Sequence, residues 1–193
     1  MTSNTATLDY SDVRDKLQDR SIALVGLMGA GKTTVGRRLA SLIGIPFSDS
    51  DQEIEEVSRM SIPELFESYG EPEFRALEAR VVSRLVLEGP RVLGTGGGAY
   101  INAETRAHLK EHAVTLWLKA DLDTLMMRVM KRSNRPLLKT GNPRATMKKL
   151  MEERYPIYGG ADIVIQSREV KRDIIAAEAA EALRDYLGKG DKL

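Results

Sequence analysis

The chain has 193 residues, enough for one α/β domain with its own hydrophobic core. Its 29 basic and 28 acidic residues nearly cancel, which argues against a nucleic-acid partner. The absence of cysteine excludes disulfides and thiol chemistry and fits a reducing compartment. We find no apolar signal segment at the N-terminus and no apolar run long enough to span a membrane. We therefore expect a cytoplasmic protein with no membrane partner.

Residues 1–20 precede the first predicted strand and are rich in Thr, Ser and Asp. Leu8, Val13 and Leu17 are compatible with one or two amphipathic turns. We favour a mobile extension without a chemical role.

Short apolar runs alternate with helical patterns along the rest of the chain. This alternation predicts a three-layer α/β/α fold, with helices on both faces of a central five-stranded parallel sheet. We expect one domain over residues 21–188, with a mobile lid at the polar, Gly- and Pro-containing segment 132–143. The predicted strands are 21–25, 45–48, 91–95, 113–118 and 163–165. The predicted helices start near residue 34 and residue 61 and cover 72–87, 102–112, 121–131, 144–155 and 170–187.

The segment Gly26–Thr33 fits the pattern G-x-x-x-x-G-K-[ST] of a phosphate-binding loop. It follows a predicted strand and precedes a predicted helix, which is the setting the motif requires. Its backbone N–H groups and the helix N-terminus suit nucleotide phosphates. Lys32 is expected to reach the β- and γ-phosphates and Thr33 to hold Mg²⁺. The predicted nucleotide-binding residues of this loop are Gly29, Ala30, Gly31, Lys32, Thr33 and Thr34.

Two other predicted strands end in residues suited to a ligand. Asp49 and Asp51 follow the second strand, and alternation along an extended segment would place both side chains on one side. One could approach Mg²⁺ through water and the other a substrate hydroxyl, unless both are solvated loop acids or helix caps. The triple glycine Gly96, Gly97 and Gly98 follows the third strand and exposes bare backbone to a ligand, or makes a tight turn.

Arginines supply the remaining candidates. Arg75 and Glu78 share a helix face, so Glu78 either forms a surface ion pair or points Arg75 at an anionic substrate. Arg135 lies in the predicted lid, where it can offset charge that develops during phosphoryl transfer. Arg154 ends a predicted helix, where a cation suits the helix dipole. Spacing alone does not single out these three arginines.

Taken together, the motifs resemble those of the shikimate kinase family. The matching segments are GLMGAGKTT (26–34), DSDQEIE (49–55), GEPEFRALE (70–78), GTGGGA (94–99), NRPLL (134–138) and ERYPIY (153–158). They occur in the family's order and span nearly the whole chain after residue 20. The resemblance implies a fold of the nucleoside-monophosphate-kinase type. It also implies transfer of the γ-phosphate of ATP to the 3-hydroxyl of shikimate, within the route to chorismate and the aromatic amino acids.

The resemblance also implies roles for individual residues. Asp51 would bind shikimate hydroxyls and act as the general base. Arg75, Gly97 and Arg154 would bind the substrate, with the arginines on its carboxylate. Asp49 and Thr33 would sit at Mg²⁺. Lys32 and Arg135 would contact phosphates and serve in catalysis, and Arg128 would lie beside adenine. We expect a monomer whose partner is the small-molecule substrate.

Three other functions share some feature with this chain. Gluconate kinase, or another small-metabolite kinase, shares the phosphate loop but not the NRPLL segment or the Asp51, Arg75 and Arg154 set. A regulatory nucleotide switch would be expected to carry N-K-x-D, which is absent. A metalloprotease is suggested by H-x-x-E-H at residues 108–112, which we interpret instead as part of a surface helix.

Overall fold

The computed structural model describes residues 9–131 and 141–190. Its core is a parallel sheet of five strands in the order β2-β3-β1-β4-β5. The strands are β1 (Ser21–Val25), β2 (Phe47–Asp49), β3 (Val92–Gly94), β4 (Ala113–Lys119) and β5 (Ile163–Gln166). All five residues of β1 are buried, as its continuous apolar run and its position between β3 and β4 require. The predicted fold class is confirmed.

The register of the sheet brings three strand ends together. Gly94 of β3 pairs with Leu24 of β1 on one side and with Asp49 of β2 on the other. The segments that leave these strands therefore emerge side by side at one edge of the sheet. In parallel α/β sheets this carboxyl edge is where ligands bind.

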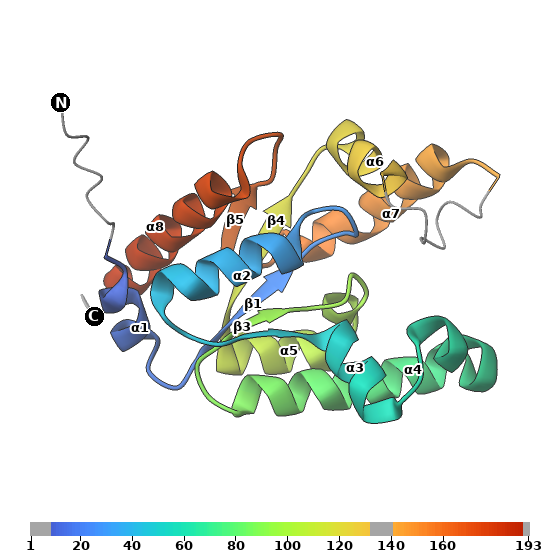
Figure 1. Ribbon diagram of the computed structural model, residues 1–193, viewed down its shortest axis with the longest axis horizontal. Coiled ribbons are helices and arrows are strands. Elements are labelled where there is room, and N and C mark those ends of the chain that lie inside the picture. Colours follow the sequence, from blue (N-terminus) through green and yellow to red (C-terminus); the bar gives the residue numbers. More distant parts are fainter. Residues whose placement is uncertain (1–8, 132–140, 191–193) are drawn as a thin grey trace.

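Helices cover both faces of the sheet (Figure 1). The helices α1 (Ser11–Leu17), α2 (Lys32–Ile43) and α8 (Arg172–Gly190) lie on one face, and α4 (Ile62–Leu87) and α5 (Ala103–His112) lie on the other. The remaining helices are α3 (Ser50–Ser58), the 3₁₀ turn η1 (Ala99–Ile101), α6 (Leu122–Met130) and α7 (Pro143–Tyr158). Within the described residues, no helix is both long and apolar enough to cross a membrane.

Helix α4 unites the two helices predicted from residue 61 and over 72–87. It begins with a capping box, in which Ser61 accepts a hydrogen bond from the N–H of Glu64 and the Glu64 carboxylate accepts one from the N–H of Ser61. Gly70 interrupts it with φ 79° and ψ 172°, a conformation that glycine adopts without strain. The interruption orients the second half of α4, which carries Arg75 and Glu78.

The N-terminal segment differs from the prediction where it is described. Residues 11–17 form α1, and Tyr10, Val13 and Leu17 are at most 1% exposed. Apolar burial and an Arg184–Asp12 ion pair of 2.8 Å fasten this segment to α8. The expected mobile extension is therefore wrong for residues 10–17, whereas residues 1–8 lie outside the described residues. Residues 132–140 of the predicted lid also lie outside them.

Candidate active site

The phosphate-binding loop connects β1 to α2, as predicted. Gly26, Gly29 and Gly31 all have positive φ angles, of 143°, 83° and 97°. A Cβ on Gly26 would lie 2.8 Å from the carbonyl oxygen of Leu118, so only glycine fits there. The Lys32 ammonium donates hydrogen bonds to the carbonyls of Gly26 (2.7 Å) and Leu27 (3.0 Å), which holds it across the mouth of the loop.

Ala30 serves the internal structure of this loop. Its N–H donates to the carbonyl of Leu27 at 3.1 Å, and its side chain is fully buried. Its carbonyl accepts hydrogen bonds from the Ser167 hydroxyl (2.6 Å) and the Arg128 guanidinium (3.3 Å). Of the predicted nucleotide-binding residues of the loop, Ala30 is the one that does not line the cavity described below.

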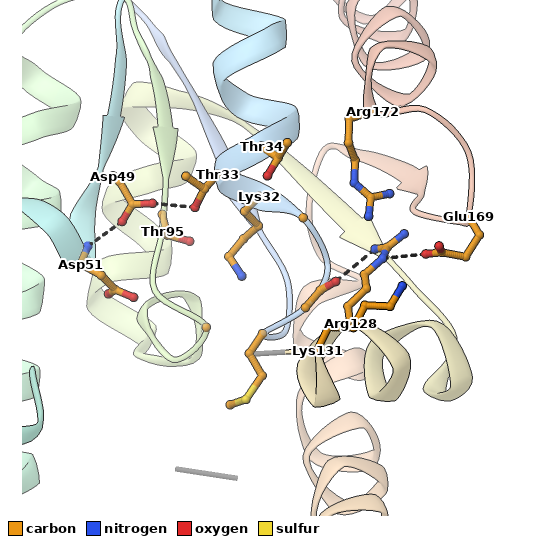
Figure 2. Close-up of a pocket in the computed structure, with 14 residues that line it drawn as sticks. Lys32, Thr33, Thr34, Asp49, Asp51, Thr95, Arg128, Lys131, Glu169 and Arg172 are labelled. Carbon is orange, nitrogen blue, oxygen red and sulfur yellow. Dashed lines mark hydrogen bonds and ion pairs between the residues drawn. The ribbon is translucent and has the colours of Figure 1, made fainter. Parts of the chain in front are cut away.

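Asp49 joins the second strand to the phosphate loop (Figure 2). Its Oδ2 accepts a 2.8 Å hydrogen bond from the Thr33 hydroxyl, and its Oδ1 accepts from the N–H of Asp51 at 3.1 Å. Asp49 is thus the N-cap of α3, which is one of the alternatives weighed from the sequence. Carboxylate and hydroxyl oxygens placed together are ligands suited to Mg²⁺, so this pair fits that ion.

Asp51 reaches the site from a helix. It lies in the first turn of α3, so the alternation of an extended strand is the wrong reason for its position beside Asp49. Burial raises the pKa of Asp51 to about 6, and the nearby carboxylates of Asp49 and Glu78 act in the same direction. A carboxylate with this pKa is ionised at neutral pH and is a stronger base than an ordinary aspartate.

The triple glycine makes room for side chains of the site itself. A Cβ on Gly96 would lie 2.7 Å from carboxylate oxygens of both Asp51 and Glu78, and a Cβ on Gly98 would overlap the Arg75 guanidinium. The N–H of Gly96 donates to the Ser50 hydroxyl at 2.9 Å. Of the three glycines, Gly97 lines the cavity, whereas Gly96 and Gly98 lie behind it against Asp51 and Arg75.

Arg75 and Glu78 form more than a surface ion pair. Arg75 Nη1 donates to Glu78 Oε2 at 2.7 Å, and Glu78 is only 3% exposed. Burial alone would lower the pKa of Arg75, but the hydrogen bond and charge of Glu78 raise it. Burial raises the pKa of Glu78, against the opposing effect of Arg75. The guanidinium is thereby held in place and fully charged, as an arginine that binds an anionic substrate would need to be.

Arg154 and Tyr158 converge on Gly97. Arg154 Nη1 donates to the Gly97 carbonyl at 3.2 Å, and the Tyr158 hydroxyl donates to the same oxygen. Arg154 lies inside α7, four residues before its end, because that helix continues through Pro156 to Tyr158. Burial raises the pKa of Tyr158 to about 12, which keeps its hydroxyl protonated and able to donate.

A cluster of cations faces Asp49 and Asp51 across the phosphate loop (Figure 2). Arg128 of α6 donates to the carbonyl of Gly29 at 3.0 Å and forms a 2.9 Å ion pair with Glu169. Arg172, at the start of α8, lies next to it. Burial and the neighbouring charge of Arg128 lower the pKa of Arg172. Lys131 points into the same region.

These residues surround a cavity of about 440 Å³, within the usual range for a small-molecule site. Arg75 and Arg154 do not line this volume but lie beside it, through their contacts with Gly98 and Gly97. Arg135 lies outside the described residues. The cavity is lined by Met28, Gly29, Gly31, Lys32, Thr33, Thr34, Asp49, Asp51, Thr95, Gly97, Arg128, Lys131, Glu169 and Arg172.

Several residues in or beside the cavity were not predicted from the sequence. Lys131, which no sequence motif singled out, lines the cavity together with Arg128. Glu169 comes from the loop after β5 and Arg172 is the first residue of α8, and no recognisable sequence motif marks either position. Tyr158 lies in the ERYPIY segment, which gave no reason to assign it a contact with Gly97. Only the fold brings these positions together with the phosphate loop.

Comparison with known proteins agrees with this geometry. The family model for shikimate kinase matches residues 28–184, well over half of the chain. A shikimate kinase from Rhizobium leguminosarum bv. trifolii is 60% identical over 170 residues, covering 88% of this chain and 87% of the relative. A shikimate kinase from Mesorhizobium japonicum is 56% identical over 173 residues, covering 90% and 85%.

A solved structure is also similar. The shikimate kinase from Acinetobacter baumannii, determined in complex with shikimate, superposes with a TM-score of 0.83 at 36% identity. The alignment covers 94% of this chain and 99% of that one. Sequence and fold therefore agree over nearly the same residues, and the chain belongs to the shikimate kinase family.

Proposed function

We propose that this chain transfers the γ-phosphate of ATP to the 3-hydroxyl of shikimate, giving shikimate 3-phosphate. As a member of its family it is an ATP-dependent kinase of the pathway to aromatic amino acids. The observation that carries the proposed chemistry is the cavity in which the phosphate loop lies between the carboxylates of Asp49 and Asp51 and the cations around Arg128. This arrangement suits a phosphate donor on one side and a hydroxyl acceptor on the other.

The phosphates of ATP would lie on the loop. Successive backbone N–H groups and the N-terminus of α2 favour anionic oxygens. The Lys32 ammonium, held by loop carbonyls, is placed to meet the β- and γ-phosphates. Arg128 packs against the opposite wall of the loop through Gly29, where we assign it to the nucleotide. Arg135, which lies outside the described residues, is assigned to the γ-phosphate, where a guanidinium stabilises the transition state.

Thr33 and Asp49 would hold Mg²⁺. Their oxygens already meet at 2.8 Å, beside Lys32. When bound, Mg²⁺ neutralises charge on the transferring phosphate. Asp49 also caps α3, so the same carboxylate fixes the position of Asp51.

Shikimate would occupy the side of the cavity formed by Asp51 and Gly97. Arg75 and Arg154 offer two guanidinium groups, which suit its carboxylate. Glu78 accepts a hydrogen bond from Arg75, and the Gly97 carbonyl accepts one from Arg154. Both guanidinium groups are therefore positioned before the substrate binds. Bare backbone at Gly97 lets the ring approach closely.

Asp51 is the general base of the proposed reaction. Its raised pKa favours uptake of the proton from the attacking hydroxyl. In a loose phosphoryl transition state, positioning and charge neutralisation contribute more than proton removal. Asp51 therefore acts first by orienting the hydroxyl and then by accepting its proton. We further propose that the enzyme works as a monomer in the cytoplasm.

The test is an ADP-release assay with ATP and Mg²⁺, run with shikimate, with gluconate and without acceptor. The proposal predicts release that depends on shikimate. ADP release with gluconate but not with shikimate would support ATP binding at the phosphate loop and would identify a different acceptor. Equal release in all three reactions would identify an NTPase and overturn the assignments of Asp51, Arg75 and Arg154.

A further inference from the structure

The motif His108-x-x-Glu111-His112 takes no part in the proposed kinase chemistry. It lies at the end of α5, on the face of the sheet covered by α4 and α5, and none of its residues lines the phosphate-loop cavity. His108 and His112 are the chain's two histidines. Both are half-buried and Glu111 is exposed, so all three can be reached from solvent.

The geometry of these three side chains is that of a metal-binding cluster. One nitrogen from each imidazole and one Glu111 carboxylate oxygen lie within 4.8 Å of one another. The two rings, one helical turn apart, have centroids separated by 4.5 Å. His112 Nε2 lies 3.7 Å from Glu111 Oε2. We propose that His108, Glu111 and His112 bind a first-row transition-metal dication, with Zn²⁺ as the reference ligand.

A neighbouring helix helps to fix one of the proposed ligands. His108 Nε2 is 2.9 Å from the Ser83 hydroxyl of α4. A hydrogen bond at one ring nitrogen sets the ring's orientation and leaves the other nitrogen, Nδ1, for a metal ion. The helix itself contributes as well, because His112 is the last residue of α5 and the carbonyl end of a helix favours positive charge.

The donor set selects the kind of metal. Two imidazoles with one carboxylate suit Zn²⁺, Co²⁺, Ni²⁺ or Cu²⁺, whereas Mg²⁺ prefers oxygen ligands alone. Three protein ligands leave further coordination positions for water. A cleft of about 590 Å³, formed by α4 and α5, has His108 and its hydrogen-bond partner Ser83 in its wall. The site is thus distinct in both position and chemistry from the proposed Mg²⁺ site at Thr33 and Asp49.

The test measures Zn²⁺ binding to the full chain, prepared without a polyhistidine tag, by calorimetry in excess Mg²⁺. We expect one Zn²⁺ per chain. His108→Ala and His112→Ala should each weaken binding by roughly tenfold or more, in the range seen when metal sites lose supporting groups. Lys110→Ala is the matched control, because Lys110 belongs to the same helix between the two histidines and should bind Zn²⁺ as the wild type does.

Spectroscopy adds two readouts, of which the NMR readout uses the wild-type chain alone and does not depend on any variant folding. Zn²⁺ should shift the imidazole NMR signals of both histidines in the wild-type chain together, and Co²⁺ should give a visible absorption spectrum that the double variant His108→Gln/His112→Gln lacks. The double variant should keep its kinase activity with Mg²⁺. Zn²⁺ that binds without moving either histidine signal, binds equally to the double variant, or does not bind in the presence of Mg²⁺ would overturn the proposal.

Discussion

The Arg75 guanidinium donates a 2.7 Å hydrogen bond to a Glu78 carboxylate that is almost completely buried. Arg75 also contacts Glu71 at 3.3 Å, but the Glu71 side chain is 64% exposed. The two acidic partners therefore differ in solvent screening, and Glu78 is the one that fixes the direction of the arginine. This difference provides a pair of matched substitutions.

Glu78→Gln should raise the KM for shikimate several-fold and leave the KM for ATP unchanged, because Arg75 loses the partner that points it toward the substrate. We also expect a loss of about 1–3 kcal/mol in unfolding free energy, since a charged hydrogen bond is removed from a buried site. Steady-state kinetics with each substrate varied in turn would measure the first effect. Glu71→Gln is the control and should change neither quantity appreciably; equal effects of both substitutions would contradict the positioning role of Glu78.

The raised pKa of Asp51 predicts how activity depends on pH. With a pKa of about 6, Asp51 becomes protonated as the pH falls through 6, so kcat/KM should decline on the acid side of that value. The measurement is a kcat/KM profile for shikimate at saturating ATP and Mg²⁺. A profile that stays flat well below pH 6 would mean that ionised Asp51 is not required.

The same group makes a separate prediction for stability. Its pKa is higher in the folded chain than in the unfolded chain, so the folded state binds more protons and stability falls as the pH rises from about 4 to about 6. Asp51→Asn removes the loss of stability that comes from ionising this buried carboxyl group. The variant should be inactive yet more stable than the wild type above pH 6, by up to about 3 kcal/mol, and the difference should vanish below about pH 4. Urea unfolding at several pH values would test it.

Tyr158 and Tyr155 provide another matched pair. The Tyr158 hydroxyl donates to the carbonyl of Gly97 in the candidate site, whereas that of Tyr155 donates to the carbonyl of Ala120. Each replacement by Phe should cost about 1 kcal/mol of stability. Only Tyr158→Phe should also raise the KM for shikimate, because it frees the backbone that Arg154 contacts. Kinetics and thermal unfolding of both variants would separate an effect on substrate binding from an effect on stability. Equal changes in the KM for shikimate would contradict a role of Tyr158 in the site.

The sequence predicted those structural features that depend on residues close together along the chain. The phosphate loop depends on glycines at fixed spacing, and the predicted helix starts near residues 61, 102 and 121 depend on a few consecutive residues, which the structure shows to include the N-caps Ser61, Asn102 and Asp121. Contacts between distant segments were not accessible in this way. Arg128 meets Gly29 across 99 positions and Tyr158 meets Gly97 across 61, and no local pattern encodes either pair. Asp51 illustrates a third case, because it lies beside Asp49 as predicted but does so from the first turn of a helix and not through the alternation of a strand.

The N-terminal helix α1 shows why the weak helical pattern at Val13 and Leu17 was not enough to predict a packed helix. A helix of seven residues is not stable alone, so its stability must come from packing that only the fold reveals. Leu17 is fully buried in the core, and the Tyr10 hydroxyl donates to Glu181 of α8 at 3.0 Å. Leu17→Ala should therefore destabilise the chain by about 2–4 kcal/mol, as expected when a buried leucine leaves a cavity.

Asp15→Ala is the control for this prediction, because the same helix exposes that residue. Its effect on the unfolding free energy should stay within about 0.5 kcal/mol. Because α1 packs chiefly on α8, Leu17→Ala should keep the wild-type KM for both substrates at temperatures where the variant remains folded. A Leu17→Ala variant as stable as the wild type would restore the expectation that this segment is a mobile extension.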